Sequence, residues 1–287
     1  CRRPCAYTGI AAACPCRGAE PKRTKGDYGK LLIVGGSVGY TGAPNLCARS
    51  AVRSGAGLVY LGVPEAIWSV CAVKTTRPCP SLFRAMLLES SPRTRSRRCG
   101  SIMTAAACSR SARSWPERWD GGSHRRAHPK VSGKIVLDAD ALWAVSLYRT
   151  SCARRRARSL SRRTRGVSPS RRLAGKTGRE RGAWEFARRY GCITVLKSHR
   201  TIIAHPAGRM YVIEAGNPGM AKGGSGDVLT GVTAALLGQM ETERAAVTAC
   251  AVHAGAGDVC AQKLGEYGMT PSDIIEELPY IFKEITE

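Results

Sequence analysis

Long apolar runs are missing from this sequence, in which no stretch approaches the roughly eighteen hydrophobic residues of a membrane-spanning helix. A positively charged leader followed by a clean apolar stretch is also missing, so a secretory signal is not indicated. The chain begins at Cys1 instead of Met, so we expect a fragment that a further segment could precede. We expect a cytoplasmic protein that does not cross a membrane.

Histidine is scarce, and the 13 cysteines include no C-x-x-C pair. Zinc modules are built from such pairs and clusters, so no metal site made of side chains is predicted. The odd cysteine count and irregular spacing also argue against a disulfide framework. Four cysteines lie in apolar stretches of the sequence: Cys47, Cys192, Cys250 and Cys260. We interpret them as small buried hydrophobic residues of a protein in a reduced compartment. His253, inside an apolar helix pattern, is interpreted as a satisfied core histidine.

Acidic residues are nearly absent from two blocks, and these blocks carry the net charge of +24. Residues 74–130 hold 13 Lys and Arg against 3 Asp and Glu, and residues 149–181 hold 13 against 1, which leaves about +2 for all the rest. A basic nucleic-acid-binding protein is one hypothesis for such charge. The blocks lack interleaved aromatic residues and an amphipathic period, so nucleic acid is not a favoured partner.

The same blocks, taken as 74–130 and 146–182, show no period of two or of 3.6 residues. One explanation is a disordered, charge-rich insertion. The other is translation in the wrong reading frame, because GC-rich coding sequence read out of frame tends to give this mixture of Arg, Ser, Pro and Cys. Residues 1–21 remain unassigned.

Outside the blocks, the hydrophobic pattern is that of an α/β domain. A strand, a helix and a strand, closed by glycines, form one βαβ unit and predict a parallel sheet. The expected strands are Leu31–Val34, Gly57–Val63, Lys134–Leu137, Ile193–Leu196, Thr201–Ala204 and Met210–Ile213, and the expected helices are Ala43–Ser54, Gly226–Leu237, Arg244–Leu264 and one capped by Thr270. We predict a single domain over residues 22–287, with a mainly parallel central sheet flanked by helices on both faces.

The strongest motif is Asn217–Gly231, in which a glycine-rich loop leads directly into a helix. Glycines let backbone N–H groups approach a ligand closely, and the start of a helix favours an anion such as a phosphoryl group. Asp227 lies in the first turn of that helix, where a carboxylate can accept a proton from an attacking hydroxyl. A simple glycine-rich turn is the alternative, and the length of the matching run argues against it.

The run N-P-G-M-A-K-G-G-S-G-D-V-L-T-G resembles the anion-hole motif of the ADP- or ATP-dependent NAD(P)H-hydrate dehydratases, which are ribokinase-like enzymes. Four separated blocks agree in the right order, among them Lys25–Ser37 and Val136–Leu142. The resemblance covers roughly residues 22–73, 131–145 and 183–285. It implies a ribokinase-like fold and the repair of hydrated NADH or NADPH (NADHX, NADPHX) by phosphorylation of the ring hydroxyl and loss of phosphate.

The resemblance also implies a set of site residues. Asp227 would be the catalytic base, and Ala43, Asp138 and Asp227 would bind the substrate. The adenine nucleotide would contact Lys197, Ser198, His199, Arg200, Thr201, Gly223, Gly224, Ser225 and Gly226. Ser198 departs from the usual glycine of this turn. Asp138 and Asp140 end a strand, where they could orient Mg²⁺ or serve as structural caps.

Two of the family's segments cannot be read: a G-P-G-L-G-like loop before Val136 and a T-P-H-x-G-E-F-like segment after Leu142. Each would fall inside one of the basic blocks, which have about the length the family needs. A pair of compensating frame changes in each block would explain the length of the blocks, their composition and the loss of both motifs. The alternatives to a dehydratase are a ribokinase-like small-alcohol or vitamin-precursor kinase and an inactive relic. An epimerase domain or partner and a homo-oligomer are further expectations.

Overall fold

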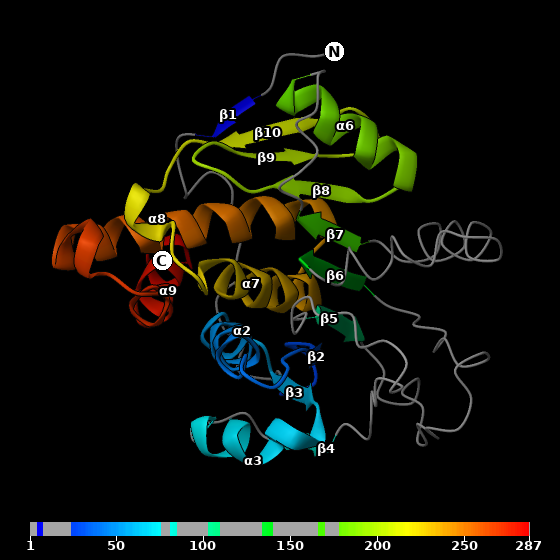
Figure 1. Ribbon diagram of the computed structural model, residues 1–287. Helices are drawn as coiled ribbons and strands as arrows, with labels where there is room; N and C mark the ends of the chain where they lie inside the picture. The colour runs from blue at the N-terminus through cyan, green and yellow to red at the C-terminus, as the bar shows by residue number, and fades with distance from the viewer. Residues whose placement is uncertain are drawn as a thin grey trace.

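One ten-stranded sheet organises the chain in the computed structural model, which describes residues 5–7, 24–75, 81–84, 103–109, 134–139, 166–169 and 178–286 (Figure 1). The strands are β1 (Cys5–Tyr7), β2 (Lys30–Val34), β3 (Leu58–Val63), β4 (Ser81–Arg84), β5 (Met103–Ser109), β6 (Lys134–Ala139), β7 (Gly166–Pro169), β8 (Ile193–Leu196), β9 (Thr201–Ala204) and β10 (Met210–Ile213). The helices are α2 (Gly42–Arg53), α3 (Glu65–Lys74), α6 (Arg179–Tyr190), the 3₁₀ turn η3 (Pro218–Met220), α7 (Ser225–Gln239), α8 (Thr242–Gly268) and α9 (Pro271–Thr286).

The strand order is β1-β10-β9-β8-β7-β6-β5-β2-β3-β4. Strands β2, β3 and β4 pair in parallel, as do β6, β7 and β8. Strand β5 lies between these two groups and runs antiparallel to both neighbours. Two successive antiparallel pairs leave β2 and β6 pointing the same way, so both parallel groups end at one edge of the sheet. The α/β prediction is confirmed, and β5, which comes from the first basic block, is the exception to the parallel order at the centre.

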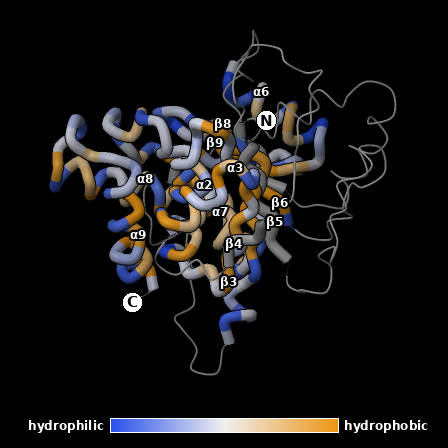
Figure 2. Tube along the Cα trace, turned by 60° about the horizontal axis from the view of Figure 1, so that its bottom comes forward, coloured by the Kyte–Doolittle hydropathy of each residue, from blue (hydrophilic) through white to orange (hydrophobic). Residues whose placement is uncertain are grey.

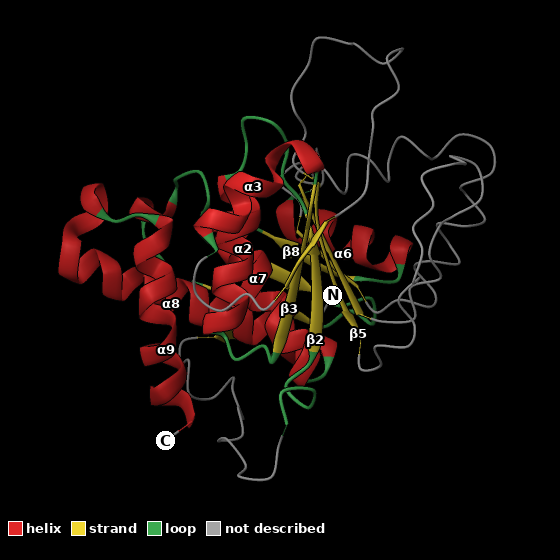
Figure 3. Ribbon diagram, turned by 90° about the horizontal axis from the view of Figure 1, so that it is seen from below, coloured by secondary structure: helices red, strands yellow, loops and turns green. Residues whose placement is uncertain are grey.

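Helices cover both faces of the sheet, because buried residues that alternate along a strand belong to two different cores. Ile203 and Ile213 face the main core beneath α2, α7, α8 and α9, whereas Ile202 and Val212 face a smaller cluster beneath α6. Successive strand residues point to opposite faces, so neighbouring residues are divided between the two cores. Figure 2 shows the apolar residues gathered along the strands and α7, and Figure 3 shows α2, α7, α8 and α9 together on one side of the strands.

Helices α2 and α7 pack at very close range on the sheet. A Cβ atom on Gly231 would lie 2.0 Å from the Ser50 Oγ and 2.1 Å from the carbonyl oxygen of Cys47, so only glycine fits. About two turns earlier, at the N-cap of α7, Gly224 has φ +105° and its Cβ would lie 2.7 Å from the Leu46 Cδ1. This packing fixes the beginning of α7 against α2.

Most element predictions outside the basic blocks are confirmed, and strands β8, β9 and β10 match residue for residue. Helix α3 is not predicted, because Trp68, Val70 and Val73 are partly exposed and blur the helical period of its buried Ile67 and Cys71. At α9, the Thr270 backbone N–H and hydroxyl both donate to the Asp273 Oδ2 over 2.7 Å, so the predicted helix start is confirmed. Within the described ranges, no helix combines the length and the hydropathy of a membrane span.

Candidate active site at the carboxyl edge of the sheet

Two charged side chains meet at the carboxyl ends of the parallel strands. Asp138 is the penultimate residue of β6, and Lys197 directly follows β8. Strand β7 lies between them and is parallel to both. Open α/β sheets bind their ligands at this edge, outside the carboxyl ends of the strands.

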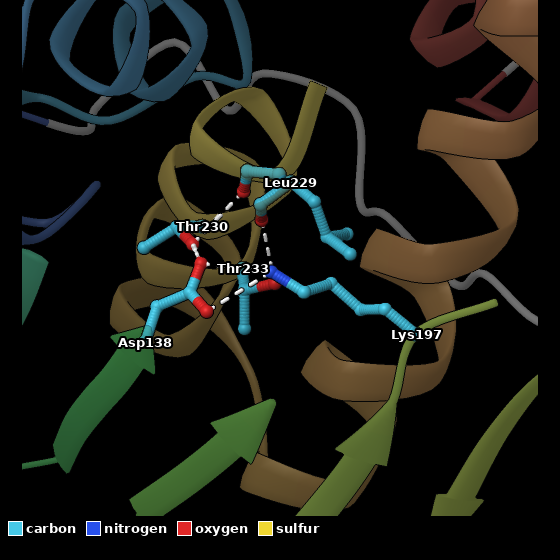
Figure 4. A network of polar contacts seen from close by, with 6 residues as sticks. Asp138, Lys197, Leu229, Thr230 and Thr233 are labelled. Carbon is cyan, nitrogen blue, oxygen red and sulfur yellow. Dashed lines mark hydrogen bonds and ion pairs between the residues drawn. The ribbon is translucent and has the colours of Figure 1, made fainter. Parts of the chain in front are cut away.

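Asp138 and Lys197 form an ion pair in which the carboxylate is buried and the ammonium group is partly exposed (Figure 4). The Lys197 Nζ lies 2.9 Å from Oδ1 and 3.0 Å from Oδ2 of Asp138, whose side chain is 5% exposed. The Thr230 hydroxyl donates to Oδ2 over 2.6 Å and contacts the Gly226 carbonyl oxygen at 3.0 Å. A carboxylate this deeply buried requires such compensation. Asp138 therefore links the end of β6 to both β8 and α7.

Lys197 also reaches the beginning of α7. A Cβ atom on Gly226 would lie 3.0 Å from the Lys197 Nζ, so glycine leaves just enough room for the ammonium group. The first backbone N–H groups of a helix carry partial positive charge, which Lys197 reinforces at this point. Lys197 and Gly226, both of which are expected to contact the nucleotide, therefore lie close to each other.

Asp227 lies in the first turn of α7 and is half-buried. Burial raises the pKa of its carboxyl to about 6, the negative charge of Asp138 adds to the rise, and the positive charge of Lys197 opposes it. A carboxylate with such a pKa is mostly ionised at neutral pH, and it is a stronger proton acceptor than an ordinary aspartate. The position and basicity of Asp227 are those required of a general base.

The glycine loop before α7 is open to a ligand. A Cβ on Gly223 would meet no atom within 4 Å among the described residues, so the backbone there is accessible. Ser225 is 7% exposed, and its hydroxyl has no hydrogen-bond partner within the described chain. Lys222, by contrast, points away: its Nζ donates to the carbonyl oxygens of Glu266, Tyr267 and Met269 at the end of α8. Backbone N–H groups and Lys197 thus supply the positive potential of the loop.

His253 lies on α8 beneath the loop. Burial lowers the pKa of its imidazole to about 4, the charge of Lys197 lowers it further, and the backbone of Ser225 opposes this. His253 is 8% exposed, so its expected place in the core is confirmed, and its ring hydrogen-bonds to the Ser225 backbone, whereas Nε2 has no hydrogen-bond partner within the described chain. A ring that stays neutral above about pH 4 is a poor candidate for the general base.

The turn from β8 to β9 contains the other predicted nucleotide contacts. Ser198, His199 and Arg200 are exposed, and the Thr201 hydroxyl donates to the Ser198 carbonyl oxygen over 3.1 Å. The Ser198 hydroxyl donates to the Arg200 carbonyl oxygen over 2.7 Å. Arg179 at the start of α6 donates to the Ser198 Oγ and, over 3.0 Å, to the Arg200 carbonyl oxygen. The serine that replaces glycine here takes part in closing the turn.

Ala43 lies in the first turn of α2 and is 8% exposed. Since Leu46 on the same helix limits the space beside Gly224, the beginning of α2 borders the glycine loop. The structure thus brings most predicted site residues to one edge of the sheet. Asp140 lies outside the described residues.

The described residues contain no group of three or more His, Cys, Asp or Glu side chains that could hold a metal ion. Magnesium in nucleotide enzymes is bound largely by the phosphates and water, with one or two carboxylates. A dedicated protein cage for Mg²⁺ is therefore not supported here, and no step of the reaction is assigned to one.

The sequence matches the family model described as NAD(P)H-hydrate dehydratase over residues 31–112 and 124–280. The chain belongs to this family. Its match extends through most of both basic blocks and omits only 113–123 between its two parts. The ribokinase-like fold inferred from the glycine-rich motif is confirmed, and the family is the one that the motifs resemble.

Three relatives illustrate the similarity. A bifunctional NAD(P)H-hydrate repair enzyme of Moorella thermoacetica is 33% identical over 308 residues, which cover 97% of this chain and 54% of the relative. The ADP-dependent (S)-NAD(P)H-hydrate dehydratase of Neisseria meningitidis is 28% identical, with 92% and 88% covered. The Bacillus subtilis ADP/ATP-dependent NAD(P)H-hydrate dehydratase, co-crystallised with ATP/Mg²⁺, has a TM-score of 0.69 at 22% identity, with 96% of each chain covered. The chain spans about half the length of the bifunctional relatives.

Two residues of the site are absent from the sequence-based prediction. Thr230 supports Asp138 and lies one helical turn after Gly226, a spacing that could have indicated it. Arg179 falls in the second basic block, where the sequence shows no helical period. The structure begins α6 at Arg179, so ordered structure starts slightly before the end of that block.

Proposed function

We propose that this chain catalyses the ADP- or ATP-dependent dehydration of NADHX and NADPHX to NADH and NADPH. The observation that carries the proposal is the half-buried Asp227, with a pKa of about 6, at the start of a helix behind an open glycine loop. Membership of the dehydratase family supports the same reaction.

The first step would be phosphoryl transfer to the hydroxyl of the hydrated ring. Asp227 would accept the hydroxyl proton as the oxygen attacks the terminal phosphorus, and the bond from phosphorus to the remaining nucleotide would break. Backbone N–H groups from Gly223 to Gly226 would stabilise the charge on the moving phosphoryl group, with Lys197 beside them. AMP would leave from ADP, and ADP from ATP.

The second step would be elimination of phosphate. Hydroxide is a poor leaving group, so phosphorylation makes cleavage of the carbon–oxygen bond feasible. Phosphate would depart with the electron pair of that bond, and loss of a proton from the neighbouring ring carbon would restore the double bond. We propose that Ala43 and Asp138 lie on the substrate side of the site, and that Lys197–Thr201 contact the nucleotide.

The experiment that tests this function follows both products. The purified chain would be incubated with NADHX and either ADP or ATP in the presence of Mg²⁺, and NADH and inorganic phosphate would be measured together. Equal amounts of NADH and phosphate are expected. A stable phosphorylated product without free phosphate would instead establish a small-alcohol kinase, and nucleotide binding without turnover would establish an inactive relic.

The names of the bifunctional relatives support further proposals about partners. We propose that the chain works with an NAD(P)H-hydrate epimerase domain or protein, which would supply the epimer that the dehydratase accepts. We also propose a homo-oligomer in the cytoplasm, where the reduced cofactors are used. Size-exclusion chromatography with light scattering tests the assembly state.

A further inference from the structure

Three basic side chains surround the turn between β8 and β9. Lys197 is paired with Asp138, as described above. Arg200 is paired with Glu214, with 2.8 Å between its Nη2 and Oε1. Each of these two residues therefore has a carboxylate partner within the protein.

Arg179 is in a different position. Its Nη2 donates to the hydroxyl oxygen of Ser198 and to the carbonyl oxygen of Arg200, and both acceptors are neutral. The ion pairs found in the described chain include none with Arg179. A guanidinium has five N–H donors, so Nε and Nη1 retain three that these contacts do not use. Arg179 thus has no ion-pair partner within the described chain, and three of its N–H donors are available at this turn; Glu180 is the acidic residue of the same helical turn.

The surrounding backbone adds to this potential. Arg179 is the first residue of the twelve-residue helix α6, and Gly178 at the N-cap provides no side chain to cap the first N–H groups. The beginning of a helix carries partial positive charge. A planar guanidinium beside it matches the oxygen pairs of a phosphate group in geometry and charge.

We propose that Arg179 is a nucleotide-binding residue that contacts the phosphate groups of the adenine nucleotide. The inference rests on the proposed function, which places the nucleotide at the turn 197–201. Its two hydrogen bonds to that turn orient the guanidinium, and the free side of the fork receives phosphate oxygens. In this arrangement Lys197 contacts the transferred phosphoryl group at the start of α7, and Arg179 contacts the phosphates of the nucleotide that remains.

Direct binding measurements test the proposal independently of turnover. The Kd values of the full chain for ADP, ATP and adenosine would be measured by calorimetry, for the wild type and for Arg179→Gln. Loss of one charge-assisted contact at an exposed site is expected to raise the Kd for ADP and ATP about tenfold. The Kd for adenosine, which has no phosphate, is expected to stay within about twofold.

A matched control is available on the same helix. Arg181 lies two residues along α6 and is paired with Glu185, so Arg181→Gln removes the same charge from a compensated position. This variant is expected to bind ADP within about twofold of the wild type. Arg179→Lys, which keeps the charge but loses the fork, is expected to give an intermediate Kd.

Each contrary outcome has a separate meaning. If Arg179→Gln binds ADP as tightly as Arg181→Gln does, the phosphate contact is refuted while the proposed function stands. If the substitution weakens adenosine as much as ADP, Arg179 only shapes the turn, and the proposal is overturned. If the wild type binds no adenine nucleotide at all, the proposed function itself fails, and this inference fails with it.

Discussion

Removing the ammonium group of Lys197 while Asp138 remains is expected to destabilise the fold strongly. The Asp138 side chain is 5% exposed and that of Lys197 is 26% exposed, so solvent screens their attraction only weakly. In Lys197→Met, the buried carboxylate would lose its cationic partner and keep the hydrogen bond from the Thr230 hydroxyl at 2.6 Å. Removing the cation from a buried ion pair costs about 3–5 kcal/mol in the free energy of unfolding.

A double-mutant cycle separates the ion pair from simple packing. Urea unfolding at neutral pH would be followed by circular dichroism for Lys197→Met, Asp138→Asn and the double variant. Asp138→Asn is expected to cost less than Lys197→Met, because the partly exposed ammonium can reach water. The double variant is expected to recover most of the loss, since it contains no unpaired buried charge. A Lys197→Met loss below about 1 kcal/mol, or a double variant as unstable as Lys197→Met, would refute the reasoning.

Four further predictions concern the base, the loop and the gene. Activity should fall as the pH decreases through about 6, because Asp227 becomes protonated there. Asp138→Asn should move the midpoint of this fall to lower pH, because the charge of Asp138 raises the Asp227 pKa. A pH–rate profile of each protein checks both predictions. Asp227→Asn should abolish turnover. Above pH 6 it should also raise the free energy of unfolding by about 3 kcal/mol, because the folded state disfavours the ionised Asp227 that the substitution removes. Urea unfolding should show this gain in stability fading as the pH falls towards 4. Gly224→Ala should weaken ADP binding at least tenfold in calorimetry, because its Cβ would collide with Leu46 at positive φ. Resequencing codons 70–185 tests the frameshift hypothesis: compensating insertions and deletions that restore a glycine-rich loop and a histidine-containing loop would support it, and an unchanged sequence would contradict it. A corrected frame that replaces Arg179 would overturn the inference about that residue.

The parts of the fold that the sequence predicts are those with a clear hydrophobic period. Strands such as Ile193–Leu196 are short apolar runs with clear ends, and α2 and α7 are bounded by glycines. These local signals need no knowledge of tertiary structure. Helix α3 has no such signal, because it is apolar on most of its surface. The antiparallel direction of β5 also has no local signature, because it depends on which neighbours the strand meets.

The site was foreseeable as a set of residues but not as a network. The glycine loop and Asp227 follow from a motif whose chemistry is local. The Asp138–Lys197 contact joins residues 59 positions apart, and it depends on β6 and β8 having their carboxyl ends at one edge. The roles of Asp227 and the nucleotide turn stay predictions. Arg179 could not be identified, since only the folded turn brings it beside Ser198.

The most direct test of the central claim is NADH formation from NADHX by the wild type and by Asp227→Asn, with ADP or ATP and Mg²⁺. Both proteins would first be shown to be folded and to bind nucleotide. The account predicts nucleotide-dependent NADH formation by the wild type and a loss of at least about a hundredfold in Asp227→Asn, the scale of a missing general base. Equal rates for the two proteins, or no NADH from a folded, nucleotide-binding wild type, would contradict it.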